Sequence, residues 1–374
     1  MISVKSLRTA CAAVALLSSL AFVQTAAAVG TAASTTVDNR ATVNYSVGGV
    51  AQSPIESSPA GNSNPGAGNG ADTTFVVDNR VDLTVTEQSG GATNVSPGQL
   101  AVVTSFTVTN DGNAPQGFQL SAANLVGGVV FGQTDNTDVN ALRVFVDNPL
   151  VGTVGVYDAN DTDVNIDTLN ADANALVFIV ADVPLSATNG QYANVRLTAL
   201  VAQPGTAGGT LVTESTGADT AGVDIVFGDP GRDASESAVD QYAVQSAALT
   251  ITKSSTLVSD PFNGTTNPKA IPGAVIEYVV TVANTGSLPA GGVTLSDTLD
   301  GNLSFLQGQY NGNASDVQIQ VGGGPATFCV AEAGADGNAD GCNRTGQTLS
   351  VNPTVAISVP PAQSATVRFR VTIN

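Results

Sequence analysis

Two acidic stretches hold the residues of this sequence that could bind a metal ion. The first is DANDTDVNID, from Asp158 to Asp167, which has four aspartates and two asparagines in ten residues. Calcium is bound by several oxygen ligands, and an EF-hand loop spaces them at alternate positions with an acid at the twelfth. The candidate calcium ligands are Asp158, Asp161, Asp163, Asn165, Asp167 and Asp172. Position six, counted from Asp161, is Ile166 instead of glycine, so a loop whose Asx side chains bind local backbone is the alternative.

The second acidic stretch is DGNADG, which begins at Asp336. Asp336, Asn338 and Asp340 follow the D-x-N-x-D-G pattern, and Gly341 allows a sharp turn around an ion. The twelfth position is Gln347, so the bidentate acid is missing or is supplied from elsewhere, for example by Glu332. A turn-rich loop without an ion is again the alternative.

Catalysis is not expected from either stretch, and we expect no enzyme. The chain has no histidine, which excludes Ser-His-Asp and Cys-His catalysis and histidine ligands for zinc. Paired carboxylates can hydrolyse glycosides. Such sites lie in deep clefts with aromatic platforms, whereas this chain has no tryptophan and only 5% aromatic residues. No G-x-S-x-G nucleophile motif is present.

The N-terminus is typical of a secretory signal peptide. Lys5 and Arg8 precede the apolar run ACAAVALLSSLAFV, and Ala26 and Ala28 form an A-x-A cleavage site. Cleavage after residue 28 predicts an exported protein, located extracellularly, at the cell surface or in the periplasm. It removes Cys11 and leaves Cys329 and Cys342, which we expect to form one disulfide. No other stretch is expected to cross a bilayer as a helix.

The charge balance narrows the class of partner. After cleavage, 10 basic residues face 31 acidic ones, a net charge of −21. Nucleic acids and anionic membranes attract clustered lysine and arginine, so neither is expected as a partner. We expect other surface proteins or further copies of this chain instead.

The remainder of the sequence predicts strands that place these residues on loops. Segments such as FTVTN, IEYVVTV and VRFRVTI alternate apolar and polar residues and are separated by Gly, Pro, Asn and Asp. Two copies of one pattern indicate tandem β-sandwiches. Each copy starts with L-T-[VI]-T and continues into N-x-G-x-x-P, and each is expected to end with a strand after Val-Pro. The matching positions are Leu83 and Leu249, Asn110 and Asn284, Gly112 and Gly286, Pro115 and Pro289, and Val183 and Val359.

These motifs carry a family resemblance. LTITK, PG, YVVTVANTG, VTLSDTL and VPPAQSATVRFRVTI, over 247–374, resemble the conserved-repeat family called domain of unknown function eleven. The resemblance over 81–205 is looser. The family resemblance implies Ig-like modules of bacterial and archaeal surface and secreted proteins. It also implies structural or adhesive roles and no shared catalytic residues.

The expected organisation is a signal peptide over 1–28, a strand segment and Gly/Pro/Ser-rich tether over 29–72, a sandwich over 73–205, a connector over 206–246 and a second sandwich over 247–374. The strand at 36–50 needs a partner sheet, either its own first sandwich or a neighbouring subunit. The sequence therefore predicts an all-β, non-enzymatic surface protein. A carbohydrate- or ligand-binding module and a filament subunit assembled by donor-strand exchange are the alternatives.

Overall fold

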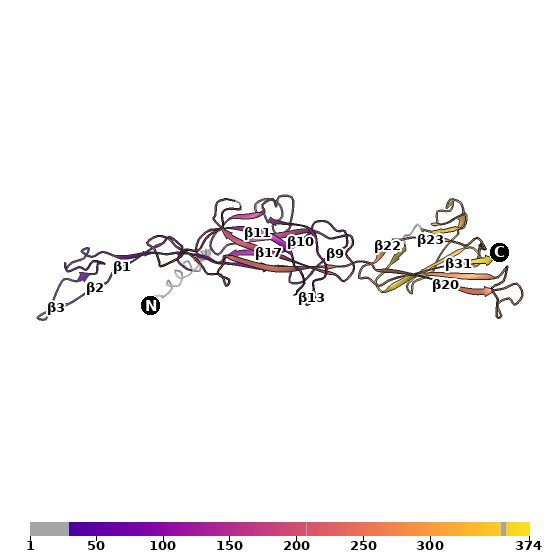
Figure 1. Ribbon diagram of the computed structural model, residues 1–374, viewed down its shortest axis with the longest axis horizontal. Helices are drawn as coiled ribbons and strands as arrows, with labels where there is room; N and C mark the ends of the chain where they lie inside the picture. Colours follow the sequence, from indigo (N-terminus) through magenta and orange to yellow (C-terminus); the bar gives the residue numbers. More distant parts are fainter. Residues whose placement is uncertain (1–29, 207, 353–356) are drawn as a thin grey trace, which may run out of the picture.

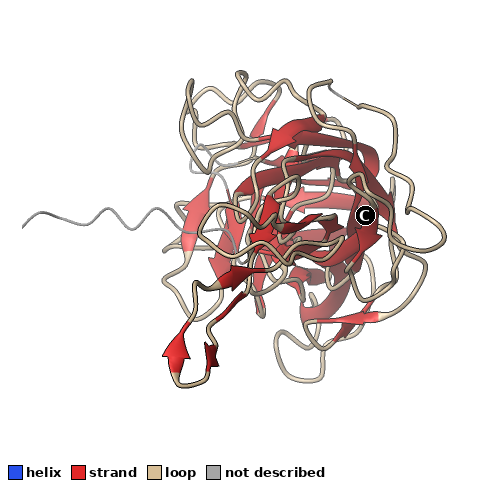
Figure 2. Cartoon of the chain, turned by 90° about the vertical axis from the view of Figure 1, so that its left-hand side faces the viewer, coloured by secondary structure: helices blue, strands red, loops and turns tan. Residues whose placement is uncertain are grey.

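The computed structural model describes residues 30–206, 208–352 and 357–374 as an elongated molecule of three consecutive parts. An N-terminal arm, a first β-domain and a second β-domain follow one another along the long axis (Figure 1). All regular elements of the described residues are strands, as the view along the axis shows (Figure 2). The search of these residues finds no helix that is long and apolar enough to cross a membrane. The predicted signal peptide, 1–28, lies outside the described residues.

The arm is a narrow antiparallel hairpin. Residues 36–39 pair with 73–76, Thr42 and Val43 with Glu56 and Ile55, and Ser46 and Val47 with Ala51 and Val50. Residues 51–72, predicted to be a tether, thus form the returning side of the hairpin. Arg40 holds the two sides together through Glu56 at 3.1 Å and Asp72 at 2.8 Å. The strands of the arm are β1 (Thr36–Asn39), β2 (Thr42–Val43), β3 (Ser46–Val47), β4 (Val50–Ala51), β5 (Ile55–Glu56) and β6 (Thr73–Val76).

The first domain is a sandwich of a four-stranded sheet, in the order β14-β16-β10-β8, and a five-stranded sheet, in the order β15-β11-β17-β19-β9. Alternate residues of β10 and β17 point into one core, which includes Phe106, Phe118 and Leu197. The strands of this domain are β7 (Asn79–Val81), β8 (Leu83–Glu87), β9 (Thr93–Val95), β10 (Val102–Asn110), β11 (Gln116–Asn124), β12 (Val129–Val130), β13 (Gln133–Thr134), β14 (Asn140–Val146), β15 (Asn165–Leu169), β16 (Asn174–Asp182), β17 (Tyr192–Ala202), β18 (Ile225–Phe227) and β19 (Ser235–Val244).

The predicted connector over 206–246 differs from the structure in its second half. Strand β19 pairs with β17 over nine residues, from Tyr192 with Ala243 to Leu200 with Ser235. Tyr242 is fully buried, and its hydroxyl donates to the carbonyls of Val102 and Ile179 in the opposite sheet. The first domain therefore extends to Val244. The Gly- and Asp-rich residues before β19 are typical of a linker. The alternation of polar and apolar residues within SESAVDQYAV, in contrast, is that of a core strand.

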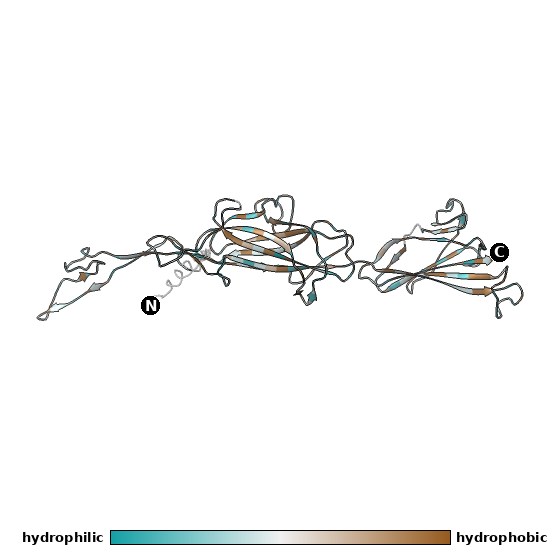
Figure 3. Cartoon of the chain, in the orientation of Figure 1, coloured by the Kyte–Doolittle hydropathy of each residue, from teal (hydrophilic) through white to brown (hydrophobic). Residues whose placement is uncertain are grey.

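The second domain has the same beginning, but its second layer is divided into two smaller sheets. One sheet has the order β20-β21-β31-β25-β26, with β24 also paired to β31, and opposite it lie β22-β30 and β23-β29-β28-β27. Apolar residues concentrate on the strands of both domains (Figure 3). The strands are β20 (Leu249–Ser259), β21 (Val275–Asn284), β22 (Ala290–Val293), β23 (Leu295–Thr298), β24 (Leu303–Leu306), β25 (Val317–Val321), β26 (Thr327–Cys329), β27 (Glu332–Ala333), β28 (Cys342–Thr345), β29 (Thr348–Val351), β30 (Ile357–Val359) and β31 (Gln363–Ile373).

The repeated N-x-G-x-x-P motif forms the same buried corner twice. The side-chain amide of Asn110 donates to the carbonyls of Ala114 and Leu169, and its oxygen accepts from the backbone N–H of Gly112. Asn284 donates likewise to Leu288 and Val359 and accepts from Gly286. Both asparagines are at most 1% exposed. The motif thus satisfies backbone groups where one strand crosses between the layers.

These corners fix which strands of the two domains correspond. Asn110 bonds to the turn before β16, and Asn284 bonds to the turn before β31, in each case through a residue with positive φ, Asp172 or Ala362. Strand β31 is therefore the counterpart of β16. The sequence-based match of Val183 with Val359 was wrong, because the Val-Pro and Ala-x-Val-Arg similarity aligned β31 with β17, a strand of the other sheet.

A short junction joins the two domains. The backbone of Gln245 still bonds to Val95 of the first domain, and β20 begins at Leu249. The side-chain oxygen of Asn189, in a loop of the first domain, accepts from the backbone N–H groups of Ser246 and Ser287 and from the Ser287 hydroxyl. Ser287 is the third residue after the corner asparagine Asn284. In both domains the residue at this position forms a hydrogen bond to the part of the chain that precedes the domain. In the first copy this residue is Asn113, which donates to the arm carbonyl of Thr31 at 3.1 Å.

Candidate functional site

The first acidic stretch is a self-bonded loop that continues into a strand. The carboxylate of Asp161 is 4% exposed and accepts from the backbone N–H groups of Asn148 and Asp158, each at 2.8 Å. Asp158 accepts from Thr153 and Asn160, and the bonds from these backbone amides hold its pKa below the usual range. The backbone carbonyl of Asp163 accepts from Val146. These contacts give the loop its shape from local hydrogen bonds.

The remaining predicted ligands of this stretch lie further along the chain. Asn165 and Asp167 belong to β15, where the Asn165 side-chain oxygen accepts from the backbone of Leu120. Asp172 lies beyond the strand, in the turn that bonds to Asn110. Among the described residues, this stretch does not supply a group of three carboxylates within 4.8 Å of one another. Calcium binding here stays a prediction, tested by comparing melting temperatures in calcium and in chelator.

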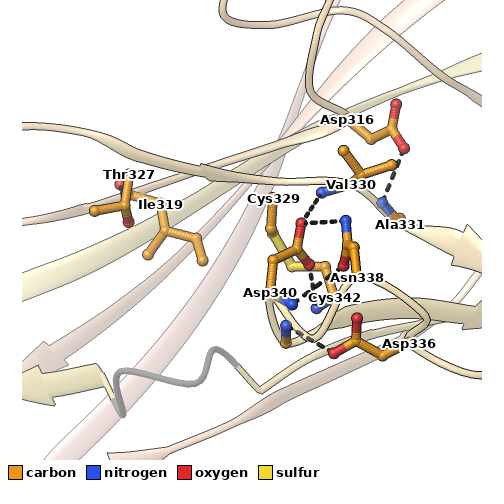
Figure 4. Close-up of a disulfide and its surroundings, with 11 residues drawn as sticks. Asp316, Ile319, Thr327, Cys329, Val330, Ala331, Asp336, Asn338, Asp340 and Cys342 are labelled. Carbon is orange, nitrogen blue, oxygen red and sulfur yellow. Dashed lines mark hydrogen bonds between the residues drawn. A yellow bond between two sulfur atoms is a disulfide. The ribbon is translucent and has the colours of Figure 1, made fainter.

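The second acidic stretch closes the disulfide loop, and the predicted bond between Cys329 and Cys342 is confirmed (Figure 4). Asp340 accepts from the backbone of Val330 at 2.7 Å and of Cys342 at 3.1 Å. The Asn338 amide also donates to Asp340, while Asp336 accepts from Gly341. The carboxylates thus organise the turn between the two cysteines. Calcium binding at this loop also stays a prediction.

Sequence spacing could not reveal a third acidic group at the base of the arm. Carboxylate oxygens of Asp78, Asp219 and Asp224 lie within 4.8 Å of one another. Asp224 donates its backbone N–H to Asp78 and accepts from the backbone and hydroxyl of Thr220. More than 140 residues separate Asp78 from its partners in sequence, so only the fold brings them together.

The most distinctive surface of the chain is an uncovered face on the second domain, here called the open face. It consists of the inner side of β20 together with the edge of β22 and β23. In the first domain, the equivalent residues Leu83 and Val85 of β8 are 2% and 8% exposed, because β17 and β19 pack over them. In the second domain, Leu249 and Ile251 are 48% and 64% exposed. Two apolar side chains whose counterparts in the first domain are buried are therefore exposed to solvent in the second domain.

The exposed residues lie where the described part of the second domain has no counterpart of β17 or β19, which in the first domain follow the counterpart of β31. In the first domain, β11 pairs with β15 on one side and with β17 on the other. In the described part of the second domain, the counterpart of β11 is split into β22 and β23, which pair only with β30 and β29. No described strand there takes the place of β17 or β19. An unpaired edge beside an uncovered apolar face is a site where another strand can add.

A single ion pair crosses the open face. The Lys253 ammonium lies 2.7 Å from a carboxylate oxygen of Asp297, which belongs to β23 in the opposite layer. The same ammonium lies 4.3 Å from the ring centre of Tyr278. Asp297 is 9% exposed, whereas the side chain of Lys253 is 39% exposed. The pair therefore joins the two layers at the boundary between the covered core and the open face.

The arm carries a second exposed apolar surface, at the opposite end of the molecule. Val43, Tyr45, Val47 and Val50 are 39–65% exposed. Ala41, Val43, Tyr45 and Val47 alternate along one side of the hairpin. Of the predicted strand at 36–50, residues 36–39 pair with 73–76, at the start of the predicted first sandwich, whereas 42–43 and 46–47 pair with the returning side of the arm.

The comparisons with known proteins give a structural likeness only. No protein-family model matches the chain, and no curated protein matches it. A solved structure described as BspA_C_WT is 8% identical, with 78% of this chain and 91% of that chain covered and a TM-score of 0.30. The class 5 fimbriae chaperone CfaA is 8% identical, with 75% and 84% covered and a TM-score of 0.21. These values do not assign a function.

Proposed function

We propose that this chain is a non-enzymatic, exported structural protein of the cell surface or extracellular space. The observation that carries the proposal is the arrangement of an arm and two β-domains end to end, with the domains joined at Asn189 (Figure 1). Only residues 245–248 connect the two domains, and Asn189 accepts three hydrogen bonds from Ser246 and Ser287. Such a junction suits a spacer of constant length. The resemblance to domain of unknown function eleven, which is a prediction of the sequence, agrees with this role.

Two alternatives follow from other features. A carbohydrate- or ligand-binding module would require a built pocket, and the depression at the junction, lined by Asn189 and Tyr192 among others, is open to solvent. A filament subunit is favoured by a specific observation, the apolar strand exposed on the arm. We therefore propose protein partners, and among them further copies of this chain.

Localisation and shape test the structural role. Antibodies against the chain should label intact cells or the culture medium. Small-angle scattering of the secreted protein should give the maximum dimension of an extended molecule. A chain retained in the cytoplasm, or two domains folded back on each other, would contradict the proposal.

A further inference from the structure

We propose that the outer edge of the arm, residues 42–46, pairs with the same edge of a second copy of this chain. The outer edge is the side of this strand that faces away from the returning side of the hairpin. The pairing is antiparallel and centred on Asn44, so two arms form one four-stranded sheet. The inference goes beyond the proposed function, because it joins two extended molecules at the tips of their arms.

The strand over 42–46 has an unpaired backbone edge. The carbonyl of Tyr45 accepts from the backbone N–H of Gln52 on the returning side at 2.9 Å. Backbone groups of an antiparallel strand point alternately to its two sides, so the neighbours Asn44 and Ser46 direct theirs away from the hairpin. The described strands of the arm form two-stranded sheets only. An edge of this kind is a template for another strand.

The opposite edge of the hairpin is closed. Pro54 has no backbone N–H, and its carbonyl accepts from the backbone N–H of Gly66 at 2.8 Å. The carbonyl of Glu56 accepts from the side-chain amide of Asn62 at 2.9 Å. The loop that follows Glu56 therefore occupies the edge of the returning strand, and a proline and a loop are both features that protect an edge from further pairing. The outer edge is thus the side of the hairpin that can accept a strand.

A second copy of the same segment fits this edge. In antiparallel pairing centred on Asn44, Thr42 lies opposite Ser46 of the second copy, and Val43 lies opposite Tyr45 of the second copy. The paired positions are both even or both odd, so the apolar residues of the two copies share one face of the sheet. Directly opposed β-branched and aromatic residues stabilise a sheet. The segment is therefore self-complementary, as a twofold contact requires.

The hairpin gains the most from such a partner. Val43, Val47 and Val50 are 55–65% exposed, and Tyr45 is 39% exposed. A two-stranded ribbon is marginally stable in water, whereas three or more strands with an apolar face are stable. Pairing of the outer edges gives four strands and brings Val43 of each copy against Tyr45 of the other.

Charge also favours the tip of the arm as the place of contact. The sequence carries a net charge of −19, so copies of the chain repel one another. Residues 41–55 contain no charged residue, so the pairing sets no like charges opposite each other. The tip lies at the end of the molecule, away from both domains (Figure 1). Repulsion between exposed charges is screened over about 8 Å at physiological ionic strength, and contact at the tips keeps the acidic domains apart.

Sedimentation velocity of the secreted chain over a wide concentration range tests the pairing. We expect a monomer–dimer equilibrium. Asn44→Asp and Asn44→Lys should each weaken the dimer at least tenfold, because each sets two like charges opposite each other at the twofold axis. A mixture of the two variants should recover dimers, since opposite charges then meet. Asn64→Asp, at an exposed position in the loop of the arm, is the matched control and should associate like the unmodified chain.

Thiol trapping gives an independent readout. Cys329 and Cys342 are bonded to each other, so Asn44→Cys introduces the reactive thiol of the secreted chain. Hydrogen-bonded residues at the axis have Cα atoms about 5.5 Å apart, a separation that a disulfide spans. Asn44→Cys should therefore form a disulfide-linked dimer, whereas Asn64→Cys should not.

Four results would overturn the pairing. They are chains that stay monomeric at every concentration, dimers that Asn44→Asp leaves unchanged, a mixture of the Asp and Lys variants that recovers no dimer, and open assemblies larger than a dimer. The last result would show a heterologous contact instead of a twofold one. Each of these results leaves the end-to-end arrangement of a single molecule and its location, and hence the proposed function, intact.

Discussion

Val85 and Ile251 occupy the same position in two copies of one structural repeat, yet the first is 8% exposed and the second 64%. Val85 pairs with Val108, two residues before the corner Asn110, and Ile251 pairs with Val282, two residues before Asn284. The residues differ little in size and polarity. Their exposure differs because β17 and β19 cover one and nothing described covers the other. Among the described residues, the difference in exposure therefore comes from the neighbouring strands and not from the sequence pattern of β20.

The corner asparagines should be the most sensitive polar residues of the fold. Asn284→Ala removes a side chain that is 1% exposed and takes its donor from the buried carbonyl of Val359 and from the partly buried carbonyl of Leu288. We expect a loss of about 2–3 kcal/mol in the free energy of unfolding. Urea denaturation measures it, and Asn352→Ala, at an exposed site of the same domain, should change little.

The disulfide should stabilise the second domain alone. Cys329 and Cys342 are 13 residues apart in sequence, and a crosslink that closes such a loop contributes about 3 kcal/mol in the chain-entropy model. Replacement of both cysteines by serine should lower the denaturation midpoint of the second domain and leave that of the first unchanged. Equal shifts in both transitions would show that the domains do not unfold separately.

The junction should depend on one side chain. Asn189→Ala removes the acceptor for Ser246 and Ser287, so the angle between the domains should become more variable. Small-angle scattering should show a broader distribution of distances, with little change in either melting temperature. Asn170→Ala, at an exposed turn of the first domain, is the control. A scattering profile unaltered by Asn189→Ala would assign the junction's rigidity to the backbone.

Acid should destabilise the second domain through Asp260. Backbone N–H groups of Asn263, Lys269 and Phe262 donate to this carboxylate, with Asn263 dominant, and they lower its pKa to about 2. The unfolded value is about 3.9, so this stabilisation is present above about pH 4 and is lost as the pH falls toward 2. The melting temperature of Asp260→Asn should fall less steeply over this window, whereas Asp138→Asn should behave like the unmodified chain.

The sequence allowed the fold class and the disulfide to be predicted and the corner motif to be seen as a repeat, because each depends on local patterns, but the buried hydrogen bonds of the corner were not predicted. Period-two alternation, the repeated N-x-G-x-x-P and a single cysteine pair are visible without coordinates. The open face was not predictable in this way. Its recognition requires the correspondence of β31 with β16, and the Val-Pro similarity between 183 and 359 concealed that correspondence.

Long-range pairing explains the other differences. Residues 51–72 are rich in Gly, Pro and Ser and were predicted to form a tether, but Glu56 binds the backbone of Gly68 and Gly70 as well as Arg40, and this shapes the returning side of the arm. Strand β19 follows a Gly- and Asp-rich stretch that suggested a connector. In both cases the partner of the strand, and not its own composition, decides whether it belongs to a sheet.

Small-angle X-ray scattering of the unmodified protein tests the end-to-end arrangement most directly (Figure 1). The account predicts the maximum dimension of an extended molecule, in which the arm, the first domain and the second domain follow one another. A maximum dimension that fits two domains folded back on each other would contradict the account.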